Sequence, residues 1–317
     1  MSQAHALQDR IEPVSFELFS KDFEAFTQRL GDSYARWGFA VISDHGMPQD
    51  KVDAAIDQMK RFFALPEETK LRYKLPVAGQ RGYTPFGVET AKGNAHFDLK
   101  EFWHVGRDLP AGHPFRDHMA DNVWPEAELP AFHDKVGWLY GALDGMGLKV
   151  LEGVATYLGL DRHFFDPTVN VGNSILRLLH YPPISGDAPG VRAGAHEDIN
   201  TITLLLGAEE AGLELLDRDG RWLPVAPNEG ELVVNIGDML QRLTNHVLKS
   251  TSHRVVNPPP ERRGVARYSM PFFLHFRPDF LIETLEGCIT SEQPNRNPVP
   301  ITADDYLMER LREIKLV

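Results

Sequence analysis

The sequence predicts an α+β fold with a mainly β core, because the second half of the chain has the pattern of an antiparallel sandwich or barrel. After Pro167, short apolar runs with β-branched residues are separated by turn signals at fairly regular spacing. The first half and the C-terminal stretch carry apolar residues at helical spacing instead. We therefore expect helices before and after a β core.

The length of the chain, 317 residues, is enough to bury a large core without covalent staples. We divide it into a helical and mixed region over residues 1–165, a β core over 166–285 and a helical tail over 286–317. The single cysteine, Cys288, cannot form an internal disulfide, so nothing in the sequence requires an oxidising compartment.

Two helices and a strand are predicted near the N-terminus. Apolar side chains recur at helical spacing over residues 20–37, and Gly38 ends that run. Residues 39–42 have the composition of a short buried strand. Pro48 suits the first turn of a second helix, which carries an apolar stripe as far as Phe63.

The middle of the chain is predicted to be loops followed by one long helix. Residues 76–125 are rich in Gly, Pro and His and are expected to form long loops with short strands at 81–83 and 97–103. Loops on a rigid frame often carry binding residues. Residues 130–160 form the long helix, whose many glycines indicate close packing against a neighbour.

The predicted strands of the β core lie at residues 174–181, 201–206, 212–216, 231–236, 252–256 and 267–276. Asp219-Gly220 is a strong hairpin turn. Residues 302–315 are predicted to be a C-terminal helix, with Thr302 and Asp305 at the spacing of an N-terminal cap.

The charge and the apolar pattern exclude some functions. The net charge of −12 argues against a general affinity for nucleic acid or for an anionic membrane. Charged residues interrupt the long apolar stretch at 136–160, so it is predicted to be a core helix and not a membrane span. Residues 1–10 are polar and lack the apolar segment of an export signal. We expect a cytoplasmic protein that is a monomer by default.

A candidate metal site begins with His196-Glu197-Asp198. Residues two apart in a strand point to the same side, so His196 and Asp198 would face one way. His253 lies further on in strand-like sequence. Two histidines and one carboxylate can bind a divalent metal on one face and leave the opposite face open, which is the ligand set typical of non-haem Fe(II) oxygenases.

A candidate anion site follows from the same spacing. Arg267 and Ser269 would project to one side of their strand, and an Arg fork beside a hydroxyl is a good clamp for a carboxylate. On an earlier strand, Tyr181 could offer a hydroxyl to the same anion. Continuing the period places Phe273 and His275 on the side of Arg267.

These ordered residues, His196-x-Asp198, His253 and Arg267-x-Ser269, resemble the Fe(II)/2-oxoglutarate-dependent oxygenases. The resemblance is to the branch that includes isopenicillin N synthase and the plant flavonoid and gibberellin oxidases. It covers residues 12–280 and includes further segments, namely Trp37-Gly38-Phe39, Asp98-Leu99-Lys100-Glu101-Phe102, Tyr181-Pro182-Pro183, Asn235-Ile236-Gly237-Asp238 and Ser252-His253-Arg254-Val255.

This resemblance implies a double-stranded β-helix, or jelly roll, wrapped by N-terminal and C-terminal helices. It implies that His196, Asp198 and His253 hold Fe(II). It also implies that Arg267, Ser269 and Tyr181 hold the distal carboxylate of 2-oxoglutarate. With O2, the enzyme would oxidise a small molecule by hydroxylation, desaturation or cyclisation and release succinate and CO2.

Two alternatives and a set of candidate substrate contacts remain open from the sequence. Arg-x-Ser also occurs in isopenicillin N synthase, which does not use 2-oxoglutarate, and Leu179 stands where many plant members have Asn. An Fe(II) oxidase without 2-oxoglutarate is therefore one alternative. A zinc hydrolase is another, although His-Glu-x-x-His is missing. Candidate substrate contacts are Arg81, Tyr83, Phe102, Phe273 and His275.

Overall fold

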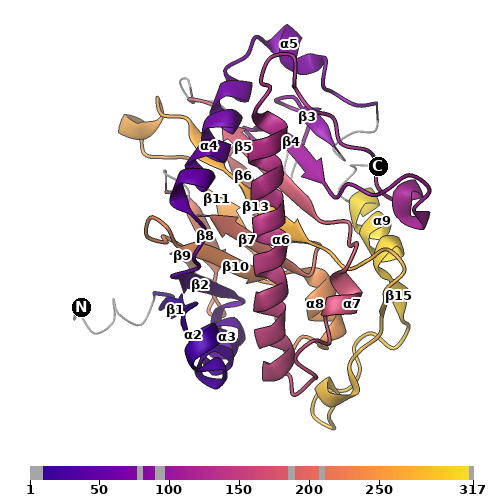
Figure 1. Cartoon of the computed structure of the whole chain (residues 1–317). Helices are drawn as coiled ribbons and strands as arrows, with labels where there is room; N and C mark the ends of the chain where they lie inside the picture. The colour runs from indigo at the N-terminus through magenta and orange to yellow at the C-terminus, as the bar shows by residue number, and fades with distance from the viewer. Residues whose placement is uncertain (1–9, 77–80, 90–96, 185–189, 207–210, 314–317) are drawn as a thin grey trace.

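The structure, a computed structural model, describes residues 10–76, 81–89, 97–184, 190–206 and 211–313 (Figure 1). Its strands are β1 (Val14–Ser15), β2 (Phe39–Ser43), β3 (Gly82–Thr84), β4 (Glu101–Gly106), β5 (Ile175–Tyr181), β6 (Ala193–His196), β7 (Ile202–Leu206), β8 (Leu213–Leu216), β9 (Trp222–Pro224), β10 (Leu232–Ile236), β11 (His253–Val255), β12 (Arg267–Ser269), β13 (Pro271–Leu274), β14 (Leu281–Ile282) and β15 (Ile301–Thr302). Its α-helices are α2 (Leu18–Lys21), α3 (Phe23–Trp37), α4 (Gln49–Phe63), α5 (Glu67–Leu71), α6 (Phe132–Tyr157), α7 (Asp166–Val169), α8 (Asp238–Leu243) and α9 (Ala303–Glu313).

Two sheets form the centre of the molecule. Within the described residues, the larger sheet has nine strands in the order β1-β2-β10-β7-β13-β5-β4-β3, with β12 also paired to β5. The smaller sheet has four strands in the order β6-β11-β8-β9. Strands from the first 165 residues extend both ends of the larger sheet, so the sheet crosses the predicted boundary at residues 165 and 166. That three-region division stays a prediction.

The two faces of the larger sheet are covered differently. Leu176 and Leu178 of β5 belong to the main core beneath the helices, whereas Leu179 and Tyr181 belong to a second apolar cluster. That second cluster also contains side chains of the smaller sheet, such as Leu215. It is therefore the interior between the sheets, and we call it the barrel interior. The period-2 pattern of the strands sorts their side chains between these two cores.

The long helix α6 covers the outer face of the larger sheet, and Figure 1 shows it crossing that face beside α4. Its glycines permit close contact, as the sequence indicates. A Cβ atom added at Gly147 would lie 2.3 Å from a methyl group of Leu274 on β13, and one added at Gly153 would lie 2.9 Å from the ring of Phe26 on α3. These separations are too short for ordinary packing. Glycine therefore lets α6 approach both β13 and α3 this closely.

Most predicted helix and strand positions are confirmed, but the strand predicted at 97–103 is displaced to 101–106, and β6 and β9 were not predicted. Two further details differ. Gly38 ends α3 with a φ of 69°, and the backbone N–H of Asp305 donates to the hydroxyl of Thr302 at 3.1 Å, as predicted for a cap. The predicted strand at 267–276 is divided into β12 and β13. Pro271 has no N–H to donate to the ladder, although the register opposite β5 is unchanged across the break.

The second detail concerns the metal-site segment. Strand β6 ends at His196, so Asp198 lies in the loop that follows and not in the strand. Its side chain still turns toward His196, and the loop is held where the backbone N–H of Asp238 donates to the carbonyl of Asp198 at 2.7 Å. Among the described helices, none is long and apolar enough to cross a membrane.

Candidate active site

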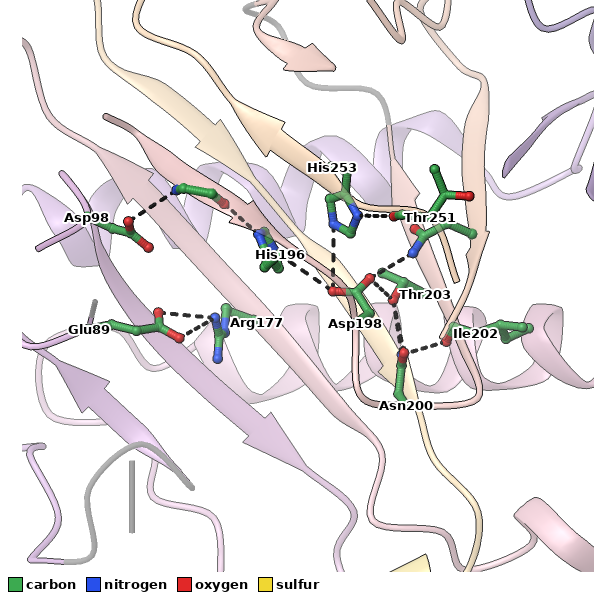
Figure 2. A network of polar contacts seen from close by, with 12 residues as sticks. Glu89, Asp98, Arg177, His196, Asp198, Asn200, Ile202, Thr203, Thr251 and His253 are labelled. Atoms are coloured by element: carbon green, nitrogen blue, oxygen red, sulfur yellow. Dashed lines mark hydrogen bonds and ion pairs between the residues drawn. The ribbon is translucent and has the colours of Figure 1, made fainter. Parts of the chain in front are cut away.

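Three side chains, those of His196, Asp198 and His253, point toward one another (Figure 2). His253 begins β11 and lies directly opposite His196 in the antiparallel pairing of β11 with β6. The Nε2 atoms of His196 and His253 lie 3.8 Å and 3.7 Å from Oδ1 of Asp198. One ligand atom from each of the three residues lies within 4.8 Å of the other two. The predicted candidate metal ligands are therefore brought together.

The hydrogen bonds around these residues leave Nε2 of His196, Nε2 of His253 and Oδ1 of Asp198 available to bind one ion. Nδ1 of His196 lies 2.7 Å from the carbonyl of Gly194, and Nδ1 of His253 lies 3.0 Å from the carbonyl of Thr251. A carbonyl can only accept, so each ring carries a proton on Nδ1 and turns Nε2 toward Asp198. Such backbone partners are the usual means of orienting a metal-binding imidazole.

The two carboxylate oxygens of Asp198 also have different partners. Its Oδ2 accepts from the hydroxyl of Thr203 at 2.5 Å and from Nδ2 of Asn235 at 2.8 Å, whereas Oδ1 faces the two imidazoles. Burial alone would raise the pKa of Asp198. The imidazoles of His253 and His196 and these two hydrogen bonds outweigh burial, so the pKa is held below its usual value. Asp198 is therefore an anion.

The imidazole of His196 is neutral at neutral pH. Its side chain is 41% accessible, but the surrounding protein still desolvates the ring. Desolvation there, together with the neighbouring His253, lowers its pKa to about 4. Two imidazoles and one carboxylate suit a divalent cation of Fe(II) type and leave coordination positions open. A closed structural zinc site would need a fourth protein ligand, and the described residues place none there.

The predicted carboxylate clamp is also assembled inside the barrel. Strand register places Arg267 opposite Tyr181 and Ser269 opposite Leu179. The guanidinium carbon of Arg267 lies 5.2 Å from the centroid of the Tyr181 ring. All of these side chains are buried. No described residue makes a hydrogen bond with the hydroxyl of Ser269 or of Tyr181, so both can bind an anion held by Arg267.

A second arginine, Arg177, enters the same interior from β5. Its guanidinium carbon lies 4.4 Å from the ring centroid of Phe102 and 5.3 Å from that of Phe273. Its Nε donates to Nε2 of His104 at 2.6 Å, and its Nη1 lies 3.3 Å from the carboxylate of Glu89. No described residue accepts a hydrogen bond from its Nη2. Two of the predicted substrate contacts, Phe102 and Phe273, thus flank a guanidinium with an open donor.

His275 and Arg81 are both buried, and the charge of Arg81 acts on the ring of His275. The ring of His275 is buried, its Nδ1 has no hydrogen-bond partner among the described residues, and its backbone N–H donates to the hydroxyl of Ser174 at 3.2 Å. Burial lowers the pKa of His275 to about 4, although the charge of Asp198 acts in the opposite direction. Arg81 packs against Gly106, where an added Cβ would meet its guanidinium.

Tyr83 lies on the other side of the larger sheet. It belongs to the main core beneath the helices, and its hydroxyl donates to Glu101 at 2.5 Å. The structure therefore places Tyr83 apart from the other predicted substrate contacts. Sequence reasoning assigned no site role to Thr203, Asn235, Arg177, Glu89 or Lys100, although Asn235 and Lys100 lie in segments that carry the family resemblance. Arg177 had one local signal, since it is spaced by two from Leu179 and Tyr181.

Two family models match the chain. One is described as the N-terminal part of the non-haem dioxygenases in morphine synthesis and matches residues 11–127. The other is described as the 2OG-Fe(II) oxygenase superfamily and matches residues 172–276. All residues of the candidate metal and anion sites fall within the second match. Phe102, Glu89 and Lys100 fall within the first.

Similar proteins agree with these family models. The 2-oxoglutarate-Fe(II) type oxidoreductase hxnY of Emericella nidulans is 35% identical over 88% of this chain and 82% of its own length. A solved structure from Caulobacter crescentus, described as a 2OG-Fe(II) oxygenase family protein, is 68% identical with a TM-score of 0.90, covering 96% and 99% of the two chains. A full-length Neurospora crassa protein, solved in complex with alpha-KG and thymine, is 29% identical with a TM-score of 0.82, covering 95% and 96%.

The chain belongs to the Fe(II)/2-oxoglutarate-dependent oxygenase superfamily. Its fold is the jelly roll that the resemblance implied, and it is a non-haem Fe(II) and 2-oxoglutarate-dependent dioxygenase that uses O2. The two alternatives, an Fe(II) oxidase without 2-oxoglutarate and a zinc hydrolase, are not favoured by these relatives.

Proposed function

We propose that this dioxygenase holds Fe(II) with His196, Asp198 and His253 and holds the distal carboxylate of 2-oxoglutarate with Arg267, Ser269 and Tyr181. The metal assignment rests on which atoms of these three residues are hydrogen-bonded and which face one another. Oδ1 of Asp198 faces the two Nε2 atoms, while its Oδ2 and both Nδ1 atoms are occupied by hydrogen bonds. When bound, Fe(II) with 2-oxoglutarate and O2 supplies the oxidising power and yields succinate and CO2.

The anion clamp gains strength from its surroundings. Arg267 and Tyr181 lie in the apolar barrel interior, with Leu179 and Val233 among its buried members. A charge-assisted hydrogen bond is stronger where water is excluded. The two hydroxyls of Ser269 and Tyr181 add donors at the sides. This supports a dicarboxylate co-substrate that enters with one end against Arg267.

The substrate in this proposal is a small neutral molecule with a flat ring and a carbonyl-type acceptor. Arg177 offers its open Nη2 to that acceptor, and the faces of Phe102 and Phe273 lie beside it. The neutrality follows from the local charges. Arg177 and Lys100 are matched by Glu89 and Asp98, with Lys100 lying 2.9 Å from each carboxylate. A substrate group at Arg177 therefore needs no charge of its own.

A solved relative supports this substrate class. The Neurospora crassa protein is described in complex with thymine, at 29% identity to this chain, and in complex with 5-formyluracil, at 30% identity. Both ligands are neutral flat rings that carry carbonyl oxygens. That likeness extends over 95% of this chain with a TM-score of 0.82.

The first test is anaerobic loading with Fe(II) followed by 2-oxoglutarate. We expect the weak visible charge-transfer absorption of the iron–keto acid chelate. Neutral ring amides such as uracil and thymine are then compared with orotate, which is uracil carrying a carboxylate. We expect succinate release to rise with the neutral probes and to stay at the background rate with orotate.

Arg177→Met supplies the test of the substrate contact, and Arg162→Met supplies its matched control. Arg162 is also paired with a glutamate and lies 3.8 Å and 5.0 Å from the centroids of two phenylalanine rings, but outside the barrel. We expect only Arg177→Met to lose the response to neutral probes while keeping the charge-transfer band. Stimulation by orotate and not by uracil or thymine would contradict the neutral substrate. Absence of the band would contradict the iron and co-substrate assignments.

A further inference from the structure

Strand β6 carries a β-bulge immediately before His196. His253 pairs with His196, and Val255 pairs with Ala193, so Gly194 and Ala195 together oppose the single residue Arg254. A bulge leaves residues outside the ladder and re-aims the neighbouring side chain. The backbone groups of Gly194 must therefore find partners other than the facing strand.

Both backbone groups of Gly194 have such partners. Its N–H donates to Oδ1 of Asp98 at 3.2 Å, and its carbonyl accepts from Nδ1 of His196 at 2.7 Å. Asp98 comes from the segment before β4, so a distant part of the chain closes the bulge. A continuous path of hydrogen bonds thus leads from the Asp98 carboxylate through one residue of backbone to an imidazole of the candidate metal site.

Asp98 is itself held in place. The ammonium of Lys100 lies 2.9 Å from Oδ2 of Asp98 and 2.9 Å from Glu89, and all three side chains are largely buried. Glu89 continues to Arg177 at 3.3 Å, beside the proposed substrate contacts. Oδ1 of Asp98 is therefore directed at Gly194 because Oδ2 is tied to Lys100, and the ion pair fixes the acceptor that the bulge uses.

We propose that Asp98, anchored by Lys100, is the positioning residue for His196 and acts through the backbone of Gly194. The proposal rests on the proposed function, since it takes His196 as a metal ligand. Removing the carboxylate leaves the buried N–H of Gly194 without a partner and lets the bulge relax. The carbonyl that orients His196 then moves, while His253, which is oriented by Thr251, keeps its partner.

The experiment uses the whole chain loaded anaerobically with Co(II), a paramagnetic substitute for Fe(II). In proton NMR, the Nδ1–H protons of metal-bound imidazoles give exchangeable, strongly shifted resonances. The wild-type protein should give two, one each from His196 and His253. Co(II) affinity is measured in parallel by titration, since the loss of such outer partners typically costs about 10–100-fold in metal affinity.

For Asp98→Ala we expect an affinity loss in that range and displacement or broadening of one of the two resonances only. Asp98→Asn preserves the volume and an acceptor oxygen but loses the ion pair to Lys100. It covers the case in which the alanine variant does not fold, and it should move the same single resonance by a smaller amount. The matched control is Glu101→Gln, which removes a buried, lysine-paired carboxylate that lies on the other face of the sheet.

Glu101→Gln should leave Co(II) affinity and both resonances unchanged. The proposal is wrong if Asp98→Asn and Asp98→Ala also leave both unchanged, or if either one moves both resonances equally. The wild-type protein alone tests the ligand assignment on which this inference rests. If the wild-type protein binds no Co(II), or shows no shifted imidazole N–H resonance, then the ligand assignment itself has failed.

Discussion

Nε2 of His253 lies 3.7 Å from Oδ1 of Asp198, although the two residues come from different segments of the chain. The pairing of β11 with β6 brings them together, and Thr203 and Asn235 hold the other oxygen of the carboxylate. Oδ1 of Asp198 thereby faces the imidazoles of both His196 and His253.

Asp198→Ala should abolish Fe(II) binding and succinate production, because the only anionic donor of the trio is lost. Bound iron is measured after anaerobic loading and desalting. Glu197→Gln is the matched control, since Glu197 is the neighbouring carboxylate and its side chain is hydrogen-bonded to Asp238. That variant should retain iron. Full iron content in Asp198→Ala would refute the assignment.

Arg267→Ala should weaken 2-oxoglutarate binding by about 2–5 kcal/mol, the usual cost of truncating one partner of a buried, hydrogen-bonded charge pair. The dissociation constant is read from the visible band during anaerobic titration. Arg267→Lys retains the charge but loses the planar fork, so it should fall between the wild-type protein and Arg267→Ala. Equal dissociation constants for all three proteins would exclude the clamp.

The stability of the protein should fall in acid through Glu101. Burial by itself raises the pKa of this carboxyl, but hydrogen bonds from His180, Lys70 and Tyr83 outweigh it and hold the pKa below its usual 4.5. The unfolded chain then binds more protons than the folded one as the pH falls through and below about 4.5, so the free energy of unfolding decreases there. Above that range the stabilising contribution is fully present.

Urea unfolding at a series of pH values checks this prediction. Glu101→Gln has no carboxyl to titrate at this position, so its free energy of unfolding should be lower at neutral pH. It should also decline less steeply in acid than that of the wild-type protein. Curves that stay parallel from neutral pH into acid would show that Glu101 does not contribute to the acid sensitivity.

Gly153→Ala should destabilise the fold by about 1–3 kcal/mol, because the new methyl group has to displace buried rings and methyls at the contact of α6 with α3. The added Cβ would lie 2.9 Å from Phe26 and 3.0 Å from Leu30. Gly141→Ala in the same helix meets no atom within 4 Å, and it should stabilise by about 0.5–1 kcal/mol through helix propensity. Thermal and urea unfolding measure both. Equal effects would contradict the packing explanation.

Much of the site was predictable because its spacing is local. His196 and Asp198 face each other despite the end of β6 between them, and the period of two from Arg267 predicts the side of Ser269 and Phe273. Gly38 at the end of α3 and the cap at Thr302 are also local features. Each depends on backbone periodicity or on a single residue's conformational preference, so the neighbouring sequence carries the information.

By itself, the sequence determined the kinds of element, their order along the chain and the ligand types of the metal site. Only the tertiary structure decided which distant residues meet. It directs Tyr83 to the outer core, turns Glu89 toward Arg177, and brings Asp98 to the bulge at Gly194. The physical reason is that helical and strand periods sort side chains between two faces within an element. Which residue lies across from them depends on how the sheets pair and pack.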